Sequence, residues 1–91
     1  MTVIWSKDVD KQVDRLPHYI QRKFFTWVEA VNLIGIRKVR MRPGFHDEPL
    51  QFVRFGQRSV RLYRSYRVFY VERRGGETEL IVVIEVNKHE Y

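Results

Sequence analysis

Two adjacent carboxylates, Asp47 and Glu48, stand beside His46 in the stretch "RPGFHDEPL". Such a group can supply the base or the proton carrier of acid–base catalysis. The same pair can also be a solvated turn or a salt-bridge partner. We assign Asp47 to a structural role in the turn, since aspartate often hydrogen-bonds turn backbone. Glu48 precedes Pro49, which favours an extended conformation and gives the glutamate a defined direction.

Arginines flank this acidic pair. The 91-residue chain has a net charge of +6, and the segment from Arg37 to Arg74 holds eleven basic but only three acidic side chains. Ten of the eleven are arginine, whose planar fork matches phosphate oxygens and stacks on bases. This bias points to a polyanion, above all nucleic acid. The alternatives are a solubilising face or a landing surface for an acidic protein.

Other kinds of chemistry have little support in the sequence. The chain has no cysteine, which excludes disulfides and thiolate catalysis. Its three histidines are widely spaced, with no HxxxH motif, and this argues against a zinc site. Neither a glycine-rich phosphate loop nor a serine-nucleophile elbow is present. We therefore expect no metal and no cofactor.

Length and composition indicate one globular domain, residues 1–91. A chain of this size forms one hydrophobic core, and 44% apolar residues are enough to fill it. The N-terminus reaches charged residues after a few apolar ones, unlike a signal peptide, and no apolar run is long enough to cross a bilayer. We expect a cytoplasmic protein without a membrane partner.

Residue patterns predict an α+β fold in the order β-α-α-β-β-β. A β-branched run is followed by Ser6, a helix-capping residue with acids after it, and a second helix extends from Pro17 to Gly35. Three later segments are rich in β-branched and aromatic residues, and "GG" between the last two indicates a hairpin. We expect a helical hairpin packed on a mostly antiparallel sheet. The predicted strands are residues 2–5, 57–64, 66–73 and 79–86, and the first helix is 7–16.

Period-two alternation sorts the side chains of this sheet. Val60 and Leu62 face one way, and Ser59, Arg61 and Tyr63 face the other. In the next strand Arg67 shares a face with Phe69 and Val71, so its guanidinium needs a polar partner. For Arg61 and Arg67 the alternative is surface charge with packed stems.

Five short motifs occur in order along the chain: "VIWS" at 3–6, "EPL" at 48–50, "G.RS.RL" at 56–62, "YRVFY" at 66–70 and the terminal "HEY". With these motifs the chain resembles the bacterial toxins of the RelE and ParE superfamily, especially YoeB-like and HigB-like mRNA interferases. The resemblance covers nearly the whole chain. The spacing of Glu48 and Arg67 is that of the glutamate and arginine in YoeB-like toxins, and no gap is needed.

The resemblance implies a RelE-like fold and cleavage of messenger RNA in the ribosomal decoding site. In that reaction a ribose 2′-hydroxyl attacks the adjacent phosphorus, which requires a base, cations for the phosphorane and an acid for the leaving oxygen. Glu48 matches the base, and Arg61 and Arg67 match the phosphate-contacting arginines. No metal is required. The candidate RNA contacts are Arg54, Arg58, Arg64 and His46.

The C-terminus departs from the YoeB pattern. YoeB-like toxins end in histidine and tyrosine, whereas Glu90 is penultimate here and His89 comes one position earlier. In an extended segment His89 and Tyr91 share a face. Both are candidates for the acid, with Tyr91 ranked first, and the alternative is a frayed terminus without a role.

The resemblance also implies partners: a cognate antitoxin with an acidic segment, and the ribosome with its mRNA, for a monomer or homodimer. Two other functions stay open. One is a non-enzymatic ParE-like toxin that binds DNA gyrase, and the other is a basic RNA-binding module whose affinity depends strongly on salt.

Overall fold

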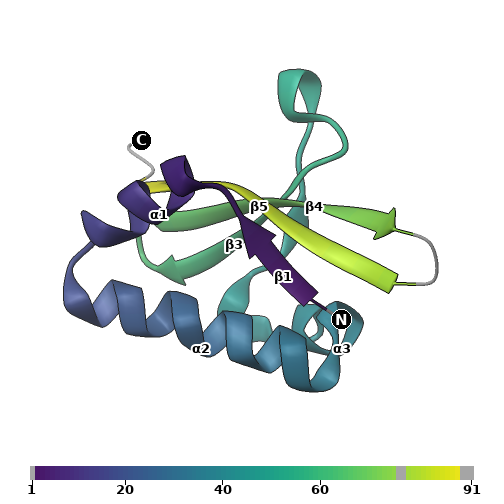
Figure 1. Cartoon of the computed structure of the whole chain (residues 1–91), viewed down its shortest axis with the longest axis horizontal. Coiled ribbons are helices and arrows are strands. Elements are labelled where there is room, and N and C mark those ends of the chain that lie inside the picture. The colour runs from purple at the N-terminus through teal and green to yellow at the C-terminus, as the bar shows by residue number, and fades with distance from the viewer. Residues whose placement is uncertain (1, 76–77, 89–91) are drawn as a thin grey trace.

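A computed structural model describes residues 2–75 and 78–88 (Figure 1). It confirms the α+β class and the predicted order of elements, and adds a third helix, a two-residue edge strand and two 3₁₀ turns. No helix among these residues has the length and apolarity that a membrane span requires. The elements are β1 (Thr2–Trp5), α1 (Lys7–Asp14), α2 (His18–Ile34), α3 (Ile36–Arg40), η1 (Pro43–Phe45), β2 (Glu48–Pro49), η2 (Phe52–Arg54), β3 (Arg58–Tyr63), β4 (Tyr66–Gly75) and β5 (Thr78–Lys88).

The helix boundaries follow local signals. The Ser6 side chain accepts a hydrogen bond from the Val9 N–H and caps α1. Gly35, at φ 86°, ends α2 in a conformation that favours glycine. The chain then turns directly into α3, whose Ile36 and Val39 are buried. Five residues are too few to show a helical period, so the sequence did not predict α3.

The sheet has the strand order β1-β5-β4-β3-β2. β4 pairs antiparallel with β3 and β5, β2 pairs antiparallel with β3, and β1 lies parallel to β5. The expectation of a mostly antiparallel sheet is confirmed. β2 lies at the end of the sheet, so the "EPL" stretch is an edge strand as well as a turn.

Helix α2 covers one face of this sheet (Figure 1). Its buried residues Ile20, Phe24, Trp27 and Val31 recur at helical spacing. The Trp27 ring packs on the Tyr70 ring of β4, with centroids 5.5 Å apart. Because this face is occupied by the core, chemistry that needs solvent access must use the other face or the sheet edges.

Helix α1 closes the edge of β5 where β1 has ended. The Val86 N–H of β5 donates to the Gln12 side-chain oxygen across 2.7 Å. A glutamine thus takes the place of a neighbouring strand, and the edge N–H is satisfied. Val9 and Val13 of α1 join the same core.

Candidate active site

The side chains of Glu48 and Arg67, which the family resemblance assigned to one site, meet across β3. The Nη1 of Arg67 lies 3.4 Å from Glu48 Oε1 and 3.4 Å from Ser59 Oγ. The Glu48 side chain is 57% exposed, whereas that of Arg67 is only 9% exposed. An accessible carboxylate therefore stands beside a nearly buried cation that neighbouring side chains hold in place.

Arg61 is next to this pair. It lies directly opposite Arg67 on the neighbouring strand. Two like charges in such a position are unfavourable unless an anion lies between them. Within the part of the chain that the structure describes, the buried Nε of Arg61 has no hydrogen-bond partner. The two arginines and Glu48 thus combine a potential base with a potential anion site.

Arg54 reaches the same face of the sheet from η2. Its guanidinium carbon lies 4.0 Å from the centre of the Phe69 ring, and its Nη2 lies 2.7 Å from Glu85 Oε1. Glu85, Phe69 and Ser59 are paired across β5, β4 and β3. Arg54 therefore covers Phe69, the direct cross-strand partner of Ser59, and lies at the border of the site.

Arg58 lies in a different cluster. In the register it pairs with Tyr70, whose ring is in the core, so it faces the side of the sheet that the helices cover. Its Nε lies 2.6 Å from Asp47 Oδ1. The structure thus does not bring Arg58 together with Glu48 and Arg67, and its RNA contact stays a prediction.

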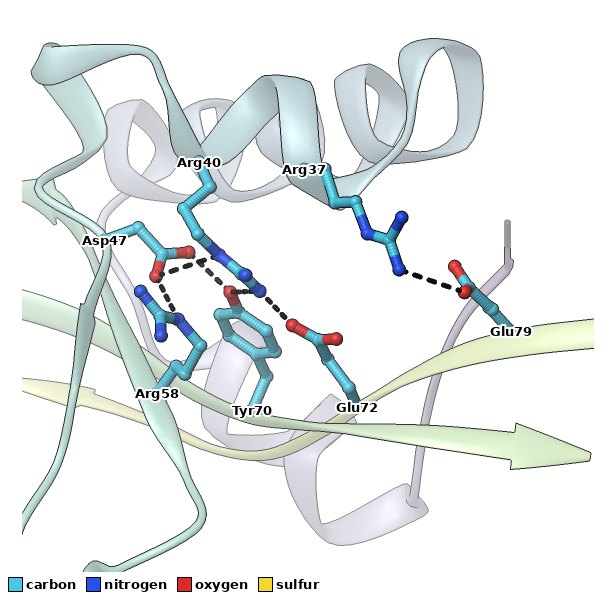
Figure 2. A network of polar contacts seen from close by, with 7 residues as sticks. All are labelled: Arg37, Arg40, Asp47, Arg58, Tyr70, Glu72 and Glu79. Carbon is cyan, nitrogen blue, oxygen red and sulfur yellow. Dashed lines mark hydrogen bonds and ion pairs between the residues drawn. The ribbon is translucent and has the colours of Figure 1, made fainter.

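Asp47 is at the centre of this second cluster, which we call the Asp47 network (Figure 2). Its side chain is only 1% exposed, and it accepts a hydrogen bond from the Tyr70 hydroxyl as well as from Arg58. Arg40 of α3 approaches the same carboxylate at 3.6 Å, donates to the Tyr70 oxygen at 3.3 Å and pairs with Glu72. The structural role predicted for Asp47 is thus confirmed, but it extends beyond the turn, because the carboxylate joins α3, β3 and β4.

Burial and charge set the protonation states of this network. Burial, followed by the bond to Asp47, raises the pKa of Tyr70 well above its ordinary value. For Arg40 burial lowers the pKa, but its bonds to Tyr70 and Glu72 outweigh that effect and raise it. Tyr70 thus stays a neutral donor, and Arg40 stays a cation.

Of the remaining predicted residues, two are exposed and two lie outside the described ranges. His46 and Arg64 are exposed, and both have positive φ angles, 46° and 34°. Arg64 stands by the Tyr63 ring in the β3–β4 turn. His89 and Tyr91 lie outside the described residues and stay predictions, as does the identity of the acid. No group of three His, Asp or Glu side chains that could hold a metal ion occurs among residues 2–75 and 78–88.

Sequence comparison decides the family. The profile described as "ParE toxin of type II toxin-antitoxin system, parDE" matches residues 3–90. The chain belongs to this ParE toxin family. Curated protein sequences provide no match.

Several solved structures share this fold, and some of them are described as toxins or toxin-antitoxin complexes. A YoeB/ParE toxin from Agrobacterium tumefaciens is 24% identical over 99% of this chain and 100% of its own, with a TM-score of 0.61. The toxin-antitoxin complex RelBE2 from Mycobacterium tuberculosis is 20% identical over 97% and 96%, with a TM-score of 0.67. YafQ from E. coli is 14% identical over 94% and 90%, with a TM-score of 0.71. At these identities the likeness establishes a RelE-like fold and leaves the reaction to be argued from the site.

Proposed function

We propose that this ParE-family toxin is a ribosome-dependent endoribonuclease that cleaves mRNA and so inhibits translation. The observation that supports it best is the meeting of Glu48 with Arg67, beside the opposed Arg61, on the face of the sheet that α2 leaves uncovered. A toxin that acts only by binding another protein has no need of an accessible carboxylate against a paired-arginine anion site.

Each group has a role in the cleavage step. Glu48 takes the proton from the ribose 2′-hydroxyl as its oxygen attacks the adjacent phosphorus. The bond from phosphorus to the 5′ oxygen breaks, and the products are a 2′,3′-cyclic phosphate and, once the leaving oxygen is protonated, a 5′-hydroxyl. Arg61 and Arg67 stabilise the charge that develops on the phosphorane oxygens. The leaving oxygen takes its proton from Tyr91 or His89.

The proposed mechanism needs no metal ion, because the substrate supplies the nucleophile and side chains supply the base and the positive charge. Arg54, Arg64, His46 and Arg58 remain candidates for contacts with RNA around the cleavage site. Of these, Arg54 is best placed, since Phe69 and Glu85 hold it at the border of the site.

The proposed setting is the bacterial cytoplasm, with a cognate antitoxin as protein partner. YoeB from Staphylococcus aureus, 14% identical over 100% of this chain with a TM-score of 0.70, has been solved in complex with YefM. An acidic antitoxin segment would complement the net charge of +6. The chain itself would act as a monomer or a homodimer.

Glu48→Gln is the decisive test. Glutamine keeps the size of the side chain but cannot accept the proton, so we expect the cleavage rate on translating ribosomes to fall by about 10²- to 10⁴-fold. Growth arrest on induction should be relieved. Glu29→Gln, an exposed change on α2, is the matched control and should leave both unchanged. Mapping RNA 5′ ends after induction gives the readout, with Arg67→Ala and Tyr91→Ala alongside.

A second candidate is favoured by the family match itself, whose description names ParE. A ParE-like toxin that binds DNA gyrase would arrest growth without cutting RNA. Glu48→Gln would then keep full toxicity, induction would cause DNA damage, and purified protein would inhibit supercoiling by gyrase. That combination refutes the endoribonuclease. Salt-dependent binding of intact RNA without either effect would indicate a plain RNA-binding module.

A further inference from the structure

Asp47 and Glu48 are sequence neighbours that point to opposite faces of the sheet. The Asp47 carboxylate is buried on the helix side, within bonding distance of Arg58 and Tyr70. The Glu48 carboxylate is on the other face, against Arg67. The direction of Glu48 is therefore coupled through a single peptide unit to the Asp47 network.

Strand β2, which presents Glu48, is held in place by few contacts. It is two residues long, at the edge of the sheet, and pairs only with β3. Before it, His46 is exposed in a left-handed conformation. After it, the Leu50 N–H bonds to Gln57 O at 3.0 Å, and the chain enters η2, where Phe52 and Val53 are 93% and 100% exposed. On the N-terminal side of Glu48 the anchors are thus the buried Phe45 ring in η1 and, directly next to Glu48, the side chain of Asp47.

The Asp47 network fixes the chain next to Glu48 firmly, because its members come from three elements. Arg40 belongs to α3, Arg58 to β3, and Tyr70 to β4 (Figure 2). Tyr70 is fully buried against Trp27, so the ring that holds Asp47 cannot easily move. By contrast, Glu48 is 57% exposed and touches Arg67 at the long distance of 3.4 Å. The contact between Glu48 and Arg67 is therefore weak, whereas the bonds that hold the neighbouring Asp47 are strong.

We propose that Asp47 is a positioning residue, which holds the β2 backbone so that the Glu48 carboxylate stays beside Arg67 and the anion site. This rests on the proposed function, since Glu48 is taken as the base. Proton transfer depends steeply on geometry, and a displacement of about 1 Å can lower a rate by about 10²-fold. Through Glu48, Asp47 therefore affects the rate of the chemical step and not the capture of RNA.

Single-turnover cleavage of mRNA on programmed ribosomes separates these two effects. For Asp47→Asn we expect the rate at saturating toxin to fall by about 10- to 100-fold, with the half-saturating concentration unchanged. Tyr70→Phe, which removes one hydrogen bond and keeps the ring, should show the same pattern to a smaller degree. Asp14→Asn, an exposed change on α1, is the matched control. Thermal unfolding of each variant gives the folded fraction by which the rates are corrected.

A double mutant distinguishes positioning from loss of stability. If Asp47 acts through Glu48, then adding Asp47→Asn to Glu48→Gln lowers the residual rate no further. If the two losses multiply, or if Asp47→Asn leaves the corrected rate unchanged, the proposal is refuted.

A crystal structure of Asp47→Asn tests directly, without an activity assay, whether Asp47 positions Glu48. We expect Glu48 Oε1 to move beyond 4 Å from Arg67 Nη1, while α2 and β3 to β5 keep their positions. A retained contact overturns the positioning role. If instead Glu48→Gln cleaves RNA as the unchanged protein does, the proposed function fails, and the crystal structure still decides whether Asp47 places Glu48.

Discussion

Tyr70→Phe isolates the contribution of one buried hydroxyl to the stability of the domain. The Tyr70 ring is 0% exposed and packs on Trp27, and phenylalanine keeps that contact. The substitution removes the donor to Asp47 and the acceptor of Arg40 Nη2. A hydrogen bond to a charged group contributes about 1.5–3 kcal/mol. Because Asp47 keeps Arg58 at 2.6 Å, we expect a loss of about 2 kcal/mol in the free energy of unfolding.

The same variant changes the dependence of stability on pH. The pKa of Tyr70 is raised in the folded protein, so at alkaline pH the unfolded chain loses this proton before the native state does. The stabilisation is complete below about pH 10 and is lost as the pH rises above it, by up to about 1.4 kcal/mol per pH unit. Without the hydroxyl this contribution disappears, so the stability of Tyr70→Phe should fall less steeply above pH 10.

Urea unfolding followed by circular dichroism measures both effects, at pH 7 and between pH 9 and 11. A loss of about 2 kcal/mol corresponds to a decrease in Tm of roughly 8–16 °C for a domain of this size. Tyr19→Phe removes a hydroxyl from an exposed ring and should change the stability by less than about 0.5 kcal/mol. If Tyr70→Phe is as stable as the unchanged protein, with the same alkaline slope, then the hydroxyl is not a buried donor and the Asp47 network is misassigned.

Two further substitutions test other parts of the structure. Arg61→Ala should weaken binding of single-stranded RNA and reduce the slope of log affinity against log salt by about 0.7, as expected for one lost phosphate contact. Arg22→Ala, on the outer side of α2, should leave the slope unchanged, and equal slopes for the two variants would exclude Arg61 from the anion site. Gln12→Ala leaves the edge N–H of Val86 without its acceptor and should lower the free energy of unfolding in urea by about 1–3 kcal/mol. The exposed change Lys11→Ala should alter it little, and no difference between the two variants would mean that water replaces the glutamine.

Local patterns predicted much of the fold and one part of the site. Ser6 and Gly35 mark helix ends through capping and backbone freedom, which are properties of single residues and their neighbours. Alternation separated Val60 and Leu62 from the face that carries Arg61, because the two-residue period of a strand is local as well. The family resemblance assigned Glu48 and Arg67 to one site, and the structure places their side chains 3.4 Å apart, while their roles stay a prediction.

The roles of Asp47 and Arg58 were not predictable in the same way. Arg58 begins β3 on the side occupied by the core, but a charged residue at a strand end is usually exposed. Its partial burial depends on Asp47, eleven positions earlier, and on Tyr70, twelve positions later in β4, both far from it in the sequence. Helix α3 was missed because its five residues show no period, although it brings Arg40 to the same carboxylate.

By itself the sequence determined the α+β class and the order of the main elements, since these depend on residue type and short periods, and it supplied candidate residues for acid–base chemistry on a phosphate. Only the tertiary structure decided which of the two adjacent carboxylates is accessible. The physical reason is the pleat of an edge strand, which sends neighbouring side chains to opposite faces. One face is filled by α2, α3 and the Tyr70 ring, so Asp47 is buried among cations there, and Glu48 is left in solvent beside Arg67.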